Sequence, residues 1–436
     1  MSRKKWLSIF LLGFAGQVAW AVENQFFNTF MYDRIIPDPL YVSIMVASSA
    51  VVATITSIFM GAFSDKLGRR KPFLFFGYLI WGISIIVIPG AGMIKPALLA
   101  AWVLILLDCL MTFFGSTAYD AAYNAYMTDI TTRKTRGRAQ GLLAVGTALA
   151  ILLTYGLSGV VIDNFGYYHF FGGVGLLVFV LGLWGGALVD DRDTPVSTMF
   201  PGRGTVWERI VGTFRRDFIR EQKSLFRVLL AMALWGMSFN VFFPFLLIYM
   251  NHYLKLNLTH STLLLFLAIF IGGVALSFPA GMLIDRVGRK KVALVAVILQ
   301  SAALFSFALT RNLIFLAAVG IVAFGAGNVW SIATGAWSKD LFPEEKRGEF
   351  AGYMTLFNVA FTMVPGPIIG GILSRMFGIK TIIEGQVAYI PTPIIIIVAS
   401  FLMLLAILPL FKLEESDPAD PAGPGNVVAP GSNGEF

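Results

Sequence analysis

Three carboxyl side chains stand inside long apolar stretches of this 436-residue chain: Glu23, Asp108 and Asp120. A charge at the centre of a bilayer costs about 2.5–3.5 kcal/mol on insertion scales. The same stretches contain no Lys or Arg that could pair with these groups. Because burial away from water favours the neutral form of a carboxyl group, the chemistry that these residues predict is the uptake and release of a proton.

Asp120 is the strongest of the three candidates. Ser116, Asp120 and Asn124 are four residues apart, so a helix places them on one face, with Tyr123 alongside. Asp120 precedes Asp129 by nine residues, or roughly 13 Å of helix, which puts it near the middle of its apolar stretch. A polar stripe of this kind should point into a helix bundle.

The other two carboxyl groups have different surroundings. Glu23 lies in the outer half of its stretch, beside the polar Asn24 and Asn28. Asp108 comes about 18 Å earlier on the helix of the first candidate and should point elsewhere, with Thr112 as its partner on the same face. For each carboxyl group, a purely structural hydrogen bond to a neighbouring helix is the alternative interpretation.

The elements that must position these groups are membrane-spanning helices. Hydrophobic residues make up 57% of the chain and charged residues 13%, with a mean hydropathy of +0.76, whereas soluble domains carry about 25% charged residues. A span needs about 20 apolar residues, and the stretches lack the alternation of barrel strands, so we expect helices. The twelve expected spans cover residues 6–32, 41–64, 73–93, 97–128, 139–162, 167–189, 225–253, 261–284, 292–309, 313–337, 350–373 and 391–411.

Basic residues predict the orientation of these spans, since Lys and Arg prefer cytoplasmic loops. With the N-terminus inside, all but six of the 33 fall on the cytoplasmic side. The net charge of +8 is therefore an orientation signal, and we expect a bilayer rather than nucleic acid as partner. A multi-pass protein of the cell membrane, such as the bacterial inner membrane, with both termini cytoplasmic is the prediction. The six outer residues are Arg34, Lys95, Lys255, Arg311, Arg375 and Lys380.

Several classes of protein are disfavoured by what the sequence contains. The one cysteine, Cys109, cannot form an internal disulfide or a thiolate metal cluster. We find no nucleotide-binding loop, so we expect neither an ATP-driven protein nor an enzyme, and no cofactor. The basic start and the Ala19–Ala21 segment could be read as a secretory signal, but its removal would put the basic loops on the wrong side.

An internal repeat divides the chain into two halves. The segment from Gly61 to Lys71 recurs from Gly281 to Lys291, and Asn24 with its two following phenylalanines recurs at Asn240. Parallel repeats of this kind build one class of transporter. We therefore predict six-helix bundles at residues 1–189 and 225–412, a linker at 190–224 with an amphipathic helix on the cytoplasmic leaflet, and a disordered tail at 413–436.

The repeated loop Gly-x-x-x-Asp-x-x-Gly-Arg-Arg/Lys-Lys resembles the signature of the major facilitator superfamily. The resemblance covers about residues 6 to 412 and implies twelve helices in two parallel halves. In that superfamily the loop latches the halves on the cytoplasmic side, although the basic residues could instead serve only as topology anchors. Gating roles are thereby implied for Asp65, Arg69, Arg70, Asp129, Arg136, Asp285, Arg289, Asp340 and Arg347.

Within the superfamily, the run Gly68 to Phe73 resembles the loop of sucrose and glycoside:cation symporters. The segments Asn124–Asp129 and Asp340–Gly348 point the same way. The second span, residues 41–64, has no carboxylate where sodium-coupled members carry theirs, so we expect proton coupling.

The second half lacks intramembrane charge and offers amides, hydroxyls and indole rings instead. Such groups suit a neutral polyol, whose hydroxyls need partners while its apolar face stacks on an aromatic ring; ordinary packing is the alternative. The predicted substrate contacts are Asn24, Asn28, Tyr123, Asn124, Trp235, Asn240, Asn328, Trp330 and Thr334.

The leading hypothesis is a monomeric, proton-coupled importer of a sugar or glycoside that works by alternating access. The first alternative is a proton-driven exporter of amphipathic or cationic compounds, or of lipids, because Glu23 in the first span could also attract a cationic drug. Pro365–Gly371 resembles a motif of drug/proton antiporters. Those antiporters carry the motif in the fifth span, whereas here it lies in the eleventh. A membrane receptor or scaffold without transport is the third, disfavoured hypothesis.

Overall fold

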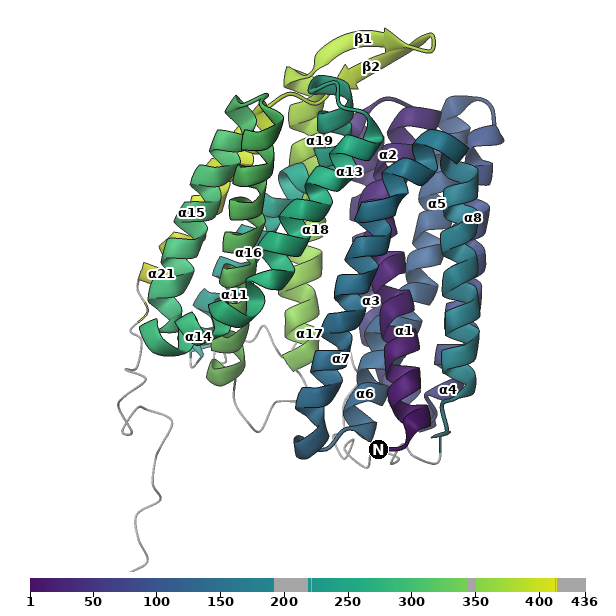
Figure 1. Ribbon diagram of the computed structural model, residues 1–436, viewed down its shortest axis with the longest axis vertical. Coiled ribbons are helices and arrows are strands. Elements are labelled where there is room, and N and C mark those ends of the chain that lie inside the picture. Colours follow the sequence, from purple (N-terminus) through teal and green to yellow (C-terminus); the bar gives the residue numbers. More distant parts are fainter. Residues whose placement is uncertain (192–218, 221, 343–349, 412, 414–436) are drawn as a thin grey trace, which may run out of the picture.

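The computed structural model describes residues 1–191, 219–220, 222–342, 350–411 and 413, and these residues are almost wholly helical. Most of the helices run roughly along one common direction (Figure 1). The chain begins at one end of this bundle, here called the N-terminal end. A β-hairpin lies at the opposite end, here called the hairpin end (Figure 1). Most of the predicted linker and nearly all of the predicted tail fall outside the described residues.

The first half comprises the described residues up to 191. Its α-helical segments are α1 (Arg3–Val22), α2 (Asn28–Phe30), α3 (Pro39–Leu67), α4 (Lys71–Val87), α5 (Ala97–Gly115), α6 (Asn124–Ile130), α7 (Arg133–Ile151) and α8 (Ser158–Ala187). Between them lie the π-helical segments η1 (Glu23–Phe27), η2 (Met31–Ile35), η4 (Ser116–Tyr123) and η5 (Leu152–Leu157) and the 3₁₀ segment η3 (Ile88–Met93).

The second half comprises the described residues from 219 onward. Its α-helical segments are α11 (Lys223–Phe242), α12 (Leu246–Ile248), α13 (Leu258–Leu267), α14 (Ser277–Val287), α15 (Arg289–Leu309), α16 (Leu313–Leu341), α17 (Phe350–Thr355), α18 (Phe361–Met363), α19 (Pro365–Phe377), α20 (Ile394–Leu404) and α21 (Ile407–Phe411). The 3₁₀ segment η7 (Phe243–Phe245), the π-helical segments η8 (Tyr249–Tyr253), η9 (Ala268–Ala275) and η11 (Leu356–Ala360), and strands β1 (Ile379–Ile383) and β2 (Gln386–Ile390) complete it.

Eleven helical stretches within the described residues are long and apolar enough to cross a membrane. The longest, at residues 134–187, has 54 residues, or about 81 Å of helix, which is far more than one crossing needs. It is interrupted at Gly166, whose φ of 81° and ψ of 171° are not helical. This stretch therefore supplies two of the twelve predicted spans, and the predicted fold class is confirmed.

Small residues let the helices approach closely inside each half. Gly82 of α4 and Gly175 of α8 face one another so tightly that a Cβ at either position would come within 2.7 Å of the other's carbonyl oxygen. In the second half, a Cβ at Gly366 of α19 would lie 2.6 Å from the carbonyl oxygen of Met237 on α11. Such contacts are the main source of helix association in lipid, where hydrophobic burial drives little.

The β-hairpin is a feature that the sequence analysis did not predict. Strands β1 and β2 pair antiparallel, with Ile379 opposite Ile390. Glu384 and Gly385, with φ of 49° and 77°, form the turn, which joins the last crossing but one to the last.

Candidate functional site

Glu23 and Asp108 lie together in the first half, on neighbouring helical segments. Thr112, one turn after Asp108 on α5, donates a hydrogen bond of 3.0 Å from its hydroxyl to Glu23 Oε1. Asp108 is only 1% exposed and lies close enough to Glu23 to act on it electrostatically. The structure places Thr112 on the face of Asp108, as predicted, and adds Glu23 opposite them.

One oxygen of this group is left without a partner. Asp108 Oδ1 is buried and accepts no hydrogen bond from the described residues. An unpaired buried polar atom costs about 1–3 kcal/mol, and neighbouring carboxylates repel one another when both are charged. A single shared proton would remove one of the two negative charges, and it would let one carboxyl group donate a hydrogen bond as well as accept one.

Asp120 lies in the π-helical segment η4, and Glu23 begins the π-helical segment η1. Segments of this rare kind occur frequently at functional sites. Ser116, four residues earlier, has a buried Oγ without a hydrogen-bond partner among the described residues, while the exposed Asn124 donates to the main-chain oxygen of Asp120 at 3.1 Å. Asp120 also acts electrostatically on Glu23, so both carboxyl groups of the fourth span repel a charge on Glu23.

Gln25, which the sequence analysis did not single out, connects the two halves. Its Nε2 donates to the main-chain oxygen of Phe243 at 2.8 Å, at the 3₁₀ break between α11 and α12. The amide of Asn24 donates to Trp20 O at 2.7 Å, and that of Asn28 donates to Asn24 O at 2.8 Å. The side-chain oxygens of Gln25 and Asn28 are buried without partners among the described residues.

Indole rings meet in the second half. The rings of Trp235 and Trp330 are stacked with centroids 6.3 Å apart, and Phe239 stacks on Trp235 at 5.7 Å. Trp235 Nε1 donates to Gln300 Oε1 at 2.7 Å. Trp330 is 1% exposed, and its Nε1 has no partner among the described residues. Of the two tryptophans among the predicted substrate contacts, Trp330 thus keeps a ring N–H without a partner among the described residues.

The remaining predicted substrate contacts have partners inside the protein. Asn328 donates to Gly273 O at 2.6 Å and to Ser277 Oγ at 2.9 Å, which ties α16 to α14 and η9. Inside their own halves, Tyr123 donates to Ile9 O at 2.8 Å, Asn240 to Gly236 O at 2.8 Å and Thr334 to Trp330 O at 2.8 Å.

An apolar cavity lies within the second half, between α11, α12, α13, α15 and α16. Phe242, Met250, Leu304 and Phe324 are among the hydrophobic side chains that line it. It contains none of the carboxyl groups or amides described above, so it is separate from the polar site.

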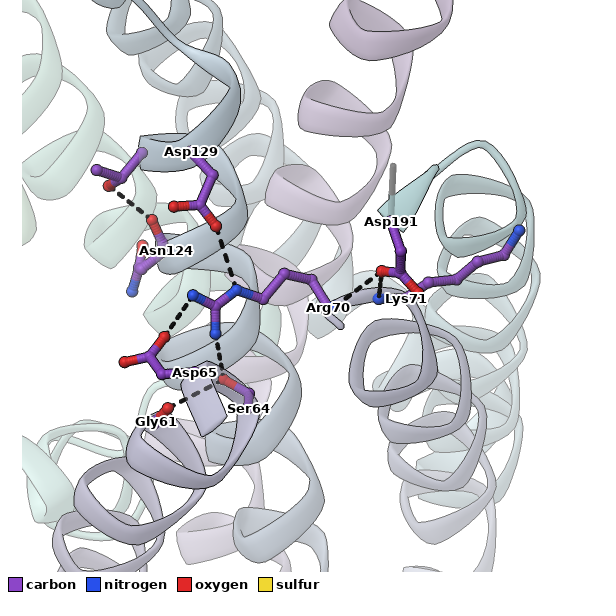
Figure 2. A network of polar contacts seen from close by, with 9 residues as sticks. Gly61, Ser64, Asp65, Arg70, Lys71, Asn124, Asp129 and Asp191 are labelled. Carbon is purple, nitrogen blue, oxygen red and sulfur yellow. Dashed lines mark hydrogen bonds and ion pairs between the residues drawn. The ribbon is translucent and has the colours of Figure 1, made fainter. Parts of the chain in front are cut away.

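Arg70 organises the N-terminal end of the first half (Figure 2). Its guanidinium pairs with Asp65, donates to Ser64 Oγ at 2.5 Å and reaches Asp129 Oδ2 at 3.2 Å. The main-chain N–H groups of Arg70 and of the next residue both donate to Asp191 at 2.8 Å. With Arg70 only 5% exposed, this network joins the ends of α3, α4, α6 and α8.

At the equivalent place of the second half, the described residues form an ion pair. Arg289 pairs with Asp340, and the two side chains are 36% and 54% exposed. The remaining residues expected to gate are Arg69, Arg136 and Asp285, which are exposed, and Arg347, which lies outside the described residues.

Polar contacts join the two halves at the hairpin end. His252 Nε2 lies 2.8 Å from Asp33 Oδ1, and Tyr167 donates to the other oxygen of Asp33 at 2.8 Å. Asp163 accepts bonds from the N–H and the hydroxyl of Thr259 at 3.0 and 2.6 Å. Sequence reasoning missed these residues because a polar side chain at the end of a span looks like any other loop residue.

Solved structures with a similar fold are membrane transporters. A nucleoside transporter, NupG, superimposes with a TM-score of 0.70 at 14% identity, over 95% of this chain and 100% of that one. A D-xylose-proton symporter gives a TM-score of 0.69 at 13% identity, over 94% and 98% of the two chains. No curated protein sequence matches the chain. The family model of the Major Facilitator Superfamily, however, matches residues 5–275 and 228–430. The chain belongs to the Major Facilitator Superfamily and is a multi-pass membrane transporter, not an enzyme.

Proposed function

We propose that the chain is a proton-coupled symporter that imports a sugar or glycoside across the bacterial inner membrane by alternating access. The observation that carries the proposal is the group of Glu23, Asp108 and Thr112, with Asp120 within electrostatic reach. It gathers one buried carboxyl group, Asp108, and two partly buried ones, Glu23 and Asp120, without a basic residue inside the spans of that half. A proton can neutralise such a site, and the loaded carrier can then change its conformation without moving a buried charge.

Two features support a neutral polyhydroxylated substrate. Open acceptors on Gln25 and Asn28 in the first half and an open donor on Trp330 in the second are complementary to hydroxyl groups. Trp235, which is partly exposed and stacks on the buried Trp330, supplies an indole ring of the kind that binds the face of a sugar ring. In this proposal the first half couples the proton and both halves hold the substrate.

The test uses purified protein in proteoliposomes with an alkaline interior. Radiolabelled D-xylose, sucrose and uridine are the probes, so that a nucleoside substrate would also be detected. For the probe that is taken up, Asp120→Asn should abolish accumulation driven by the pH gradient and leave substrate exchange at equal pH largely intact. Glu384→Gln removes an exposed carboxyl from the hairpin turn and should change neither. Full gradient-driven accumulation by Asp120→Asn would contradict the assignment.

A proton-driven exporter of amphipathic or cationic compounds is the second candidate. The observation that favours it is the pair of Glu23 and Asp108, which would form an anionic site when charged. Aromatic rings in both halves could hold a cation. Ethidium efflux from proteoliposomes that depends on Glu23, together with no uptake of the three neutral probes, would favour this candidate over import.

A further inference from the structure

The hairpin of β1 and β2 is supported by the opposite half of the protein. An isolated two-stranded hairpin is marginally stable in water, and its outer strand edges offer unpaired main-chain groups. The connection between η2 and α3 lies along β2, with Ile36 and Asp38 both extended at φ of −146° and −126°. Tyr389 N–H of β2 donates to Pro37 O of this connection at 3.0 Å.

Two side chains complete the same edge. Tyr32, at the hairpin end of the first crossing, donates its hydroxyl to Tyr389 O at 3.0 Å. Gln386, the first residue of β2, donates its side-chain amide to Ile35 O at 3.2 Å. In an antiparallel ladder alternate residues turn their N–H and C=O groups outward, and both outward groups of Tyr389 are thus taken by the first half.

Charged and aromatic contacts flank this edge on both sides. Arg375, in the last turn of α19, lies 3.7 Å from Asp38 and stands over the ring of Tyr389 at 5.4 Å. Next to them, the ring of Tyr32 packs edge-on against His252 at 4.9 Å. The contacts therefore form one continuous patch rather than scattered pairs.

We propose that the hairpin is a strap: β2 binds residues 35–38 of the opposite half through hydrogen bonds and holds the hairpin end closed. These hydrogen bonds must break each time that end opens. The proposal rests on alternating access in the proposed function, but it concerns a different part of the molecule from the carboxyl groups. Hydrogen bonds of this kind suit a strap, because the net contribution of each is small and water can replace it when the hairpin end opens.

The strap can be tested without knowing the substrate. Spin labels at Tyr168, 46% exposed in the first half, and Ile314, 81% exposed in the second, report the separation of the halves at the hairpin end by double electron–electron resonance. Both positions are changed to Cys in a Cys109→Ser background. The parent should show mainly one short distance.

The strap variant is Tyr32→Phe combined with Gln386→Ala, which removes two bonds across the halves while keeping the ring that packs on His252. The ratio of open to closed population should rise about tenfold, as expected for two ordinary hydrogen bonds. Thr392→Val is the matched control, since Thr392 donates at 3.1 Å to Phe377 O within the second half. It should leave the distances of the parent unchanged.

A strap variant with the same distance distribution as the parent would overturn the proposal, as would a parent without the short distance. If the double variant loses its helical circular dichroism, Tyr32→Phe alone carries the test with a smaller shift. Failure of the proposed function would be seen separately, as absent or proton-independent uptake of D-xylose, sucrose and uridine by a protein whose distances still respond to the strap variant.

Discussion

The two copies of the repeated loop share a sequence motif, but their structures differ. In the first half, Arg70 is buried and its guanidinium joins Asp65, Ser64 and Asp129. In the second half, the ion pair of Arg289 and Asp340 is half exposed. The first copy is thus a network that connects several helices, and the second is a surface contact.

The backbone explains the difference. After Gly68, in the left-handed conformation at φ 61° and ψ 21°, two residues precede α4, which begins at Lys71. After Gly288, at φ 97° and ψ 151°, α15 begins at once with Arg289. By the repeat, Arg70 corresponds to Lys290, whose Nζ donates to the main-chain oxygens of Phe411 and Leu413.

From the residues that the structure describes, we expect the Arg289–Asp340 contact of the second half to be weaker than the Arg70 network of the first. A guanidinium can bridge two carboxylates with its planar fork, whereas an ammonium acts as a point charge. The same loop motif can therefore fix one half as a rigid unit and leave the other with a contact that separates at little cost.

The largest effect is expected for Arg70→Ala. The change leaves two carboxyl groups, 27% and 20% exposed, without their cation, and breaking a buried pair in this way typically costs 3–5 kcal/mol. Because both carboxyl groups keep some contact with water, we expect a loss of about 3 kcal/mol in the free energy of unfolding. SDS-induced unfolding in mixed micelles measures it. A loss below about 1 kcal/mol would show that the first copy is no stronger than a surface pair.

A smaller effect is expected where the two glycines differ. Gly288 has a φ of 97° and a ψ of 151°, a region that is essentially restricted to glycine, so Gly288→Ala should cost about 2 kcal/mol. Gly68 is in the left-handed helical region, and Gly68→Ala should cost about 1 kcal/mol. The same unfolding assay compares the two. Equal losses, or a larger loss at Gly68, would contradict the backbone explanation.

The fold could be predicted from the sequence because its determinants are local. Each crossing is a run of apolar residues, and the repeat at Gly61–Lys71 and Gly281–Lys291 shows directly that two halves exist. The hairpin was missed because the span pattern leaves residues 374–390 as a loop. The signal is present in the β-branched residues on both sides of Glu384 and Gly385, but a two-stranded element is decided by its contact with residues 35–38.

The candidate site was predictable only where partners share a helix. The spacing of Asp108 and Thr112 put both on one face of α5, and the structure places Thr112 in hydrogen-bonding contact with the same site through Glu23. The meeting of Glu23 with Asp108 depends on how two helices are rotated against each other, and the π-helical turn that begins at Glu23 departs from the 3.6-residue period. Gln25 was overlooked for the same reason, since its partner is a main-chain oxygen of the other half.

The smallest effect is expected for Arg289→Ala. Exposed ion pairs contribute between about 0.2 and 1 kcal/mol, so the loss in the free energy of unfolding should be about 0.5 kcal/mol. Salt should reduce even this, because charges at the surface are screened over about 3 Å at 1 M ionic strength. Arg70→Ala should keep most of its effect at the same salt concentration, since the Arg70 side chain is buried and its two carboxylate partners are only partly exposed. If Arg289→Ala costs as much as Arg70→Ala, the second loop must be fastened as firmly as the first, and the two halves then differ in geometry but not in strength.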